Sequence, residues 1–193
     1  ATILFSVVFS DYITKITKFD NPEKVLSNYY VGQTYGEIWG YETAGYFTSD
    51  EEAKNWHIDQ SAVSNLIYSS AGDLKKLGNT QPRYQYGINL GASWLGFDFS
   101  IFLQGVGHMD WYPDPEAELF WGPYSRPYAT FIPADFMSKM WSEENPNSYF
   151  PRPRGYIAMK KNRTLGAIND RYLQNIGYCR LKNLTFGVTI PES

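Results

Sequence analysis

The chain has 193 residues, with 17 Lys and Arg against 20 Asp and Glu, so its formal charge is -3. Aromatic residues make up 18% of the sequence and charged residues 19%, a composition that excludes intrinsic disorder and collagen. Because the balance is mildly acidic and no basic run exceeds two residues, we expect no nucleic acid partner.

The first predicted strand covers residues 2–14. Apolar residues occupy the odd positions from Ile3 to Phe9, although Leu4 and Val8 interrupt the alternation. The sequence begins inside this strand, without an initiator Met or a signal peptide, so we expect a fragment of a longer protein. No apolar run approaches the roughly 18 residues of a membrane helix, whereas the alternating strands of a membrane barrel leave no such run.

The most regular pattern predicts a β-hairpin with strands at 83–94 and 97–106. From Tyr84 to Trp94 the even positions are apolar or aromatic, and the odd positions are Gln, Gly, Asn or Ser. The parity reverses after Leu95 and Gly96, as a two-residue turn requires, and Phe102 is the exception in the second strand. The resulting register pairs Trp94 with Phe97, Ala92 with Phe99, Leu90 with Ile101 and Ile88 with Leu103.

One face of this hairpin carries no charge and has aromatic residues at both ends. About eleven residues at about 3.3 Å each, tilted by about 45°, span roughly 25 Å, the height of the apolar band of an outer-membrane barrel. The pattern therefore predicts a lipid-facing band made of Tyr84, Tyr86, Ile88, Leu90, Trp94, Phe97, Phe99, Ile101 and Leu103. The alternative is the buried face of a hairpin in a soluble sandwich.

The last predicted strand covers residues 172–190. Apolar residues at even positions from Leu184 to Ile190 alternate with Asn, Thr and Gly. Upstream, Arg180 and Lys182 share the parity of that apolar row, so this part is expected to lie above the hydrocarbon.

Two long connections, at about 18–82 and 107–171, separate the predicted strands. Because bacterial barrels have short periplasmic turns and long extracellular loops, both connections are predicted to be extracellular and the turn at 95–96 periplasmic. The second connection holds 8 of the 11 prolines, which favours a folded loop over regular structure. In the first, residues 49–52 form a capping box for a short helix through Trp56.

Segments spread in order over nearly the whole chain resemble the C-terminal half of the SusC/RagA family, the TonB-linked outer-membrane receptors of Bacteroidetes. They are YVGQTYGEIWGYE (30–42), GNTQPRYQYG (78–87), FDFS and QGVG (97–107), FPRPRG (150–155), and RYLQN and LKNLT (171–185).

The resemblance implies part of a 22-stranded antiparallel transmembrane barrel, a class whose lumen is plugged. This chain would supply about four strands and two extracellular loops, without the plug domain. The implied function is active import of oligomeric nutrients, glycans by default or peptides. The implied partners are a SusD-like surface lipoprotein that acts as a lid, outer-membrane lipid, and the TonB complex, which engages an N-terminal region absent from this sequence.

The sequence departs from the family pattern at two places. Family members carry an Asp/Asn/Gly-rich, calcium-loop-like stretch before the segment that here begins at Gly72, whereas this sequence passes directly through Ser69, Ser70 and Ala71. Either the loop is short or residues are missing between Ser70 and Gly72. Family members also continue through several strands beyond Pro191, which again indicates a fragment.

Aromatic and arginine side chains in the loops are the candidate contacts to cargo or to the lid. Flat apolar ring faces are costly to leave in water, so they could stack on sugars or fill pockets of a partner. Alternatively, they form the core of the loops themselves. The candidates are Trp39, Tyr41, Trp111, Tyr112, Trp121, Tyr124, Arg152 and Arg154, with a structural role favoured for the two arginines.

The sequence contains no recognisable catalytic or metal-binding motif, so we expect neither an enzyme nor a cofactor or metal site. His57 and His108 lie in different predicted loops and read as solvated or structural, and Cys179 reads as a small packed residue. Two other classes remain open. One is a soluble, secreted β-rich carbohydrate-binding domain, and the other is a glycoside hydrolase fragment with a carboxylate pair.

Overall fold

The computed structural model describes residues 1–47, 51, 55, 66–68, 74–125, 132–152, 156–159 and 165–190. Regular structure in these ranges is mostly β-strand with little helix, which confirms the all-β class. In the described part of the chain, no helix is long and apolar enough to cross a membrane. Of the predicted helix from the capping box to Trp56, only Glu51 and Asn55 are described, and both are helical. The abrupt passage at 69–72 lies outside the described residues.

The chain divides into two compact units. The first, which we call the wall unit, consists of Ala1–Glu37, Asn79–Trp111 and Asn175–Ser193. The second, the loop unit, consists of Ile38–Gly78 and Tyr112–Gln174, so it combines parts of both predicted long connections.

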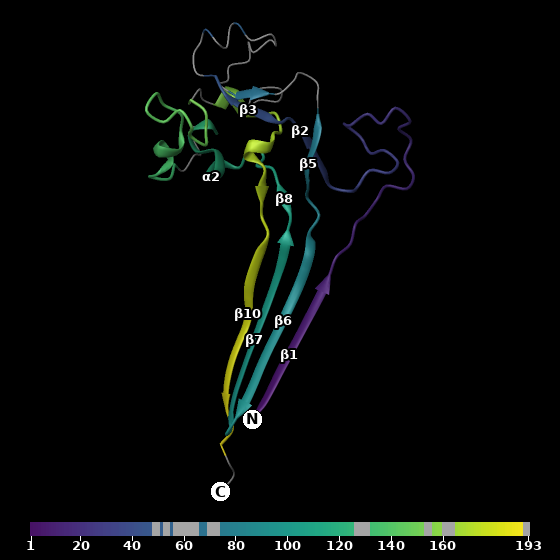
Figure 1. Ribbon diagram of the computed structural model, residues 1–193, viewed down its shortest axis with the longest axis vertical. Coiled ribbons are helices and arrows are strands. Elements are labelled where there is room, and N and C mark those ends of the chain that lie inside the picture. The colour runs from purple at the N-terminus through teal and green to yellow at the C-terminus, as the bar shows by residue number, and fades with distance from the viewer. Residues whose placement is uncertain are drawn as a thin grey trace. The chain divides into compact units, whose positions relative to one another are not determined.

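The wall unit is built on a four-stranded antiparallel sheet. Its strands are β1 (Thr2–Ser10), β6 (Arg83–Trp94), β7 (Phe97–His108) and β10 (Tyr178–Val188), in the spatial order β1-β6-β7-β10 (Figure 1). The sheet is open within the described residues, with β1 and β10 at its edges. The short strands β8 (Asp110–Trp111) and β9 (Gln174–Asn175) pair beyond the ends of β7 and β10.

The hairpin of β6 and β7 has the register that the alternation predicts. Trp94 pairs with Phe97, and the pairing continues by steps of two through Ile88 and Leu103. Leu95 and Gly96 both have positive φ, at 49° and 83°. A turn with two positive φ values matches the right-handed twist of the flanking strands, which explains why two residues close this hairpin.

Strand β10 differs from the expected strand in two ways. The expected strand 172–190 is divided, because η4 (Asp170–Tyr172) and β9 (Gln174–Asn175) precede β10, which begins at Tyr178. The register of β10 against β7 also shifts between Leu181 and Asn183. Such a β-bulge adds one residue to one strand and so exchanges the faces of all residues beyond it. The expectation that Arg180 shares the apolar row was therefore wrong, since Arg180 pairs with Gln104 on the opposite face.

The loop unit contains two small sheets and several short helices. Strand β2 (Glu37–Gly40) pairs with β5 (Lys75–Asn79), and β3 (Thr43–Tyr46) pairs with β4 (Leu66–Tyr68). The helical segments are α2 (Glu118–Trp121) and the 3-10 turns η1 (Gly122–Tyr124), η2 (Phe136–Lys139), η3 (Tyr156–Met159) and η4 (Asp170–Tyr172). Its core is formed by Trp121, Tyr124, Phe136, Met140, Phe150, Met159, Leu165 and Tyr172.

Candidate functional site

The sheet of the wall unit has one apolar face. Pairing across the four strands aligns its side chains in five rows, none of which contains a charged residue. Starting at the turn, the rows are Trp94-Phe97-Val188, Ile3-Ala92-Phe99-Phe186, Phe5-Leu90-Ile101-Leu184, Val7-Ile88-Leu103-Leu181 and Phe9-Tyr86-Gly105-Cys179. The side chains on the edge strands are well exposed, with Phe5 at 65% and Phe186 at 68%, whereas Ile88, Ile101 and Leu103 on the central strands are half-buried. Soluble monomers rarely expose a contiguous apolar surface of this extent, so the face requires an apolar cover.

At the end of this face far from the turn, tyrosine side chains of β6 pack on residues of the neighbouring strands. Tyr86 covers Gly105 of β7, where an added Cβ would lie 2.3 Å from the Tyr86 Cζ atom. Tyr84 has φ of 57°, and its ring stacks on Phe9 with centroids 6.4 Å apart. An aromatic ring over a strand glycine restores the packing that the missing side chain leaves open.

The opposite face of the sheet is predominantly polar. Its rows, again from the turn, are Thr2-Ser93-Asp98-Gly187, Leu4-Gly91-Ser100-Thr185, Ser6-Asn89-Phe102-Asn183, Val8-Gly87-Gln104-Arg180 and Ser10-Gln85-Val106-Tyr178. The three residues that interrupt the sequence pattern lie beside glycines of β6. Leu4 pairs with Gly91, Val8 pairs with Gly87, and the Phe102 ring lies 3.2 Å from the position of a Gly87 Cβ.

An ion pair marks the end of the apolar face between β1 and β6. Arg83 donates from Nε and Nη2 to the two carboxylate oxygens of Asp11, at 2.5 and 2.7 Å. The hydrogen bond from Arg83 lowers the pKa of Asp11 to about 2. Bidentate geometry of this kind fixes the relative position of two chain segments. β1 ends at Ser10, before the expected residue 14, because the next residue turns to this contact.

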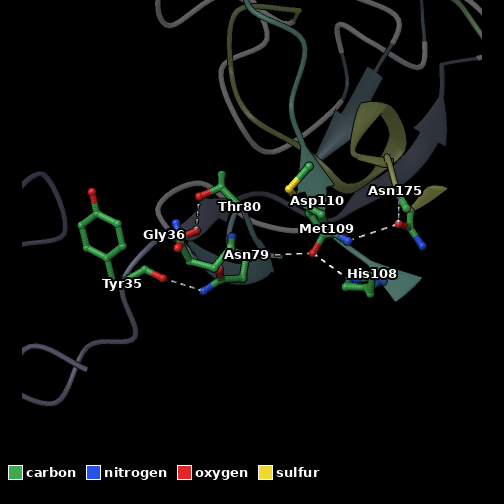
Figure 2. Close-up of polar contacts among 10 residues, drawn as sticks. Tyr35, Gly36, Asn79, Thr80, His108, Met109, Asp110 and Asn175 are labelled. Atoms are coloured by element: carbon green, nitrogen blue, oxygen red, sulfur yellow. Dashed lines mark hydrogen bonds and ion pairs between the residues drawn. The ribbon is translucent and has the colours of Figure 1, made fainter. Parts of the chain in front are cut away.

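A hydrogen-bonded polar hub lies beyond β7 in the wall unit (Figure 2). Asp110 is 8% exposed, and its Oδ2 atom accepts the backbone N–H of Asn79 at 2.9 Å and lies 3.1 Å from His108 Nε2. The Asn79 amide in turn donates to the carbonyl of Tyr35 at 3.0 Å. The Asn175 side chain accepts the backbone N–H of Met109 at 3.4 Å. His108 thus has a structural contact, and the hub ties the segments at 35, 79, 109 and 175 together.

The loop unit is held by a cluster of aromatic rings around Phe150. The Phe150 ring lies 4.8 Å from that of Phe136, 5.7 Å from that of Tyr172 and 5.8 Å from that of Tyr124, between ring centroids. Asn169 is fully buried, and it donates to the Tyr112 hydroxyl at 3.1 Å and accepts the backbone N–H of Tyr172 at 3.3 Å. Burial of several aromatic side chains is the main stabilising contribution to a unit with so little regular structure.

Two of the predicted contact residues belong to this core. Trp121 and Tyr124 have no exposed surface, the indole N–H of Trp121 donates to the Asp114 carbonyl, and the Tyr124 hydroxyl donates to the Pro151 carbonyl. Their ring faces are therefore covered by the loop unit itself. For these two residues the structure supports the alternative interpretation, a loop that packs on itself.

The other predicted contact residues lie nearer the surface. Trp39 and Tyr41 are half-buried in β2 and just after it, and Trp111 ends β8 with 37% exposure. Tyr112 is half-buried, and its hydroxyl donates to the Ala167 carbonyl at 3.1 Å. The backbone N–H of Tyr41 donates to Ile168 at 2.9 Å, which links the first long connection to the second.

The arginines of the loop unit have different environments. The Arg152 guanidinium lies over the Trp141 ring, 4.3 Å from its centroid, in a half-buried cation–π pair. Arg154 lies outside the described residues. Arg171 donates to the carbonyls of Ser148 and Tyr149 at 2.5 and 2.9 Å. Arg171 belongs to the segment RYLQN (171–175) that resembles the family, and no local sequence pattern predicts its contacts with the two carbonyls.

Within the described ranges, no group of three or more His, Cys, Asp or Glu side chains is arranged to hold a metal ion. His57 lies outside those ranges. Cys179 is exposed on the apolar face rather than packed in a core, because the bulge of β10 places it opposite Gly105.

The sheet and its two faces define a class of protein, an antiparallel β-structure with one apolar and one polar surface and a separate unit of folded loops. No protein-family model matches the chain. The chain is 29% identical over 172 residues to the "TonB-dependent receptor P3" of Formosa agariphila. The match covers 84% of this chain but only 16% of that receptor. The similarity supports the TonB-dependent receptor family for this chain.

Proposed function

We propose that this chain forms barrel wall and loops of a TonB-dependent outer-membrane receptor of the SusC/RagA type, which imports oligomeric nutrients. The observation that carries the proposal is the pair of faces on the β1-β6-β7-β10 sheet. One face has five rows of side chains without a charge, and the other is mainly Ser, Thr, Asn, Gln and Gly. In a barrel wall, lipid would cover the apolar face, and the polar face would line a water-filled or plugged lumen.

The same proposal assigns the surroundings of each unit. The residues predicted to face lipid, from Tyr84 to Leu103, all belong to the wall unit. The folded connections, 18–82 and 107–171, are proposed to be extracellular and to meet a SusD-like lipoprotein lid, with Trp39, Trp111 and Arg152 as contact candidates. The relative is named a TonB-dependent receptor, which supports outer-membrane nutrient import rather than catalysis, and we propose glycans or peptides as the imported nutrients. The TonB complex would engage the receptor outside this chain.

Fractionation of the source cells tests the proposal directly. Antibodies against the loop unit would identify the natural polypeptide, and its intact mass and peptide map would be measured. The expected product is several times 22 kDa, resides in the outer membrane, and requires detergent to stay monodisperse. A product of about 22 kDa that is monodisperse without detergent would instead favour the soluble carbohydrate-binding domain. Deletion of the gene, followed by growth on a panel of oligosaccharides and peptides, would identify the cargo.

A further inference from the structure

The β-bulge lies partway along β10, an edge strand of the sheet, and it interrupts an otherwise regular ladder with β7. On the turn side of it, Leu184 occupies the third apolar row, and on the far side Leu181 occupies the fourth. Lys182 is the additional residue between them, because the register shifts between Leu181 and Asn183. Bulges of this kind bend a strand and change the direction of a side chain.

The first consequence of the bulge is that Arg180 lies on the polar face. It pairs with Gln104, in the row that also contains Gly87 and Val8. The Arg180 guanidinium lies over the ring of Tyr178, with its Cζ atom 4.2 Å from the ring centroid. A cation–π contact holds the guanidinium in place while its N–H groups remain available as donors.

The second consequence concerns Lys182. This residue is exposed, and among the described residues neither Lys182 nor Arg180 has a carboxylate within ion-pair distance. A lysine on a lipid face at the middle of a bilayer costs about 2–4 kcal/mol. Lys182 is the residue that the bulge adds, directly before Asn183 on the polar face, and the proposal below places its side chain on that face beside Asn183 and Arg180.

The nearest charge of opposite sign on the polar face is distant. Asp98 lies in the first polar row and accepts a hydrogen bond from Ser93 at 2.6 Å, whereas Arg180 lies in the fourth row. Three rows correspond to about six residues, or about 20 Å along the strand. That separation exceeds the screening length of about 8 Å at physiological ionic strength, so Asp98 does not neutralise the two cations.

We propose that Arg180 and Lys182 form an anion-binding position on the polar face, which takes a carboxylate, sulfate or phosphate group carried by the cargo. The guanidinium offers paired N–H donors to such a group, and the amides of Gln104 and Asn183 flank it on the same face. The inference rests on the proposed function, because the polar face must line the receptor lumen for cargo to reach it. An anion-binding position would mean that the imported nutrient carries anionic groups.

Cysteine reactivity in the complete receptor tests this position. The background variant is Cys179→Ser, and Asn183→Cys or Gln104→Cys introduces a thiol beside the two cations, with Ser100→Cys as a control two rows from Arg180. Each variant in outer-membrane vesicles is treated with anionic sulfonatoethyl methanethiosulfonate or cationic trimethylammonioethyl methanethiosulfonate. The rates are normalised to those of a free thiol.

The expected result is an anionic preference of about 10-fold at positions 183 and 104, since a local positive potential concentrates the anionic reagent. The preference should be absent at position 100, and it should disappear when Arg180→Gln and Lys182→Gln are added. Inorganic sulfate at constant ionic strength should slow the anionic reagent at position 183.

The failures of the two proposals are distinguishable. Equal rates for both reagents at positions 183 and 104, with both thiols reactive, would overturn the anion-binding position and leave the lumen intact. If thiols at 183, 104 and 100 all resist both reagents, the polar face does not meet water and the proposed function fails with it.

Discussion

If the sheet spans a membrane, neighbouring residues on one strand should face lipid and the lumen in turn, and the same substitution should have very different costs at the two positions. Ile101 and Ser100 are neighbours on β7, but Ile101 lies in the third apolar row between Leu90 and Leu184, whereas Ser100 lies on the polar face between Gly91 and Thr185. We compare Ile101→Arg with Ser100→Arg in the complete receptor. The two variants introduce the same side chain at the same depth on the same strand.

The magnitude follows from the position of the row. Two rows separate Ile101 from either end of the five-row face, which amounts to about 9 Å along the membrane normal at a tilt of about 45°. An arginine on the lipid side at such a depth costs about 2–4 kcal/mol. The folding equilibrium should therefore fall by a factor of about 30 to 900. At Ser100 the cost should stay below about 1 kcal/mol, because this residue lies on the polar face between Gly91 and Thr185.

The assay is denaturant-dependent folding into lipid vesicles, followed by the folded fraction at each denaturant concentration. A second set of measurements in detergent micelles is a control, since micelles adapt more readily to a charged side chain. Equal costs for the two variants, or a larger cost for Ser100→Arg, would refute the assignment of the apolar face to lipid.

Three further predictions concern packing and charge. Phe150→Ala should destabilise the loop unit by about 3–5 kcal/mol and raise its protease sensitivity, because Phe150 is buried among six aromatic rings. Met137→Ala, at a position 73% exposed, is the control and should change stability by less than about 0.5 kcal/mol. Gly105→Ala should lower the free energy of unfolding in denaturant by about 1–3 kcal/mol, because the new Cβ would lie 2.3 Å from Tyr86 Cζ and 2.4 Å from the Tyr178 carbonyl oxygen. The control is Gly187→Ala, which should be tolerated because the nearest atom to its new Cβ is 3.5 Å away. Equal effects of the two substitutions would contradict the packing argument. The ion pair of Asp11 with Arg83 should stabilise the receptor fully above about pH 4 and lose its effect as the pH falls towards 2, because the hydrogen bond from Arg83 lowers the folded-state pKa of Asp11 from its ordinary value of 3.8 to about 2. The difference in melting temperature between the parent and Asp11→Asn should shrink over that interval, and a constant difference would argue against the ion pair.

The hairpin is the part of the fold that was predicted most completely. Its strands follow each other in sequence, its turn is two residues long, and its register depends only on the alternation about Leu95 and Gly96. The bulge at Lys182 was missed for a related reason. One extra residue reverses the parity of the alternation, but the short stretch from Tyr178 to Leu181 has too few alternating apolar residues to reveal the reversal. The position of Arg180 was wrong as a direct result.

The loop aromatics show where local sequence information ends. Tryptophan and tyrosine are suited both to binding surfaces and to cores, and the sequence around Trp121 and Tyr124 does not distinguish the two. The choice depends on Phe136, Phe150 and Tyr172, which lie up to about 50 residues away and close over both rings. Likewise, no local pattern indicates that Asp110 receives the backbone N–H of Asn79.

By itself, the sequence determined the all-β class, the central hairpin and its charge-free face, because these depend on periods of two residues and on a turn between neighbouring strands. Only the tertiary structure decided that β1 lies beside β6 and β10 beside β7, and that Arg180 lies on the polar face. The same holds for the burial of Trp121 and Tyr124 in their own loop unit. The physical reason is that strand neighbours, bulges and loop cores depend on contacts between residues far apart in the chain, and the residue types at one end of such a contact do not specify the other end.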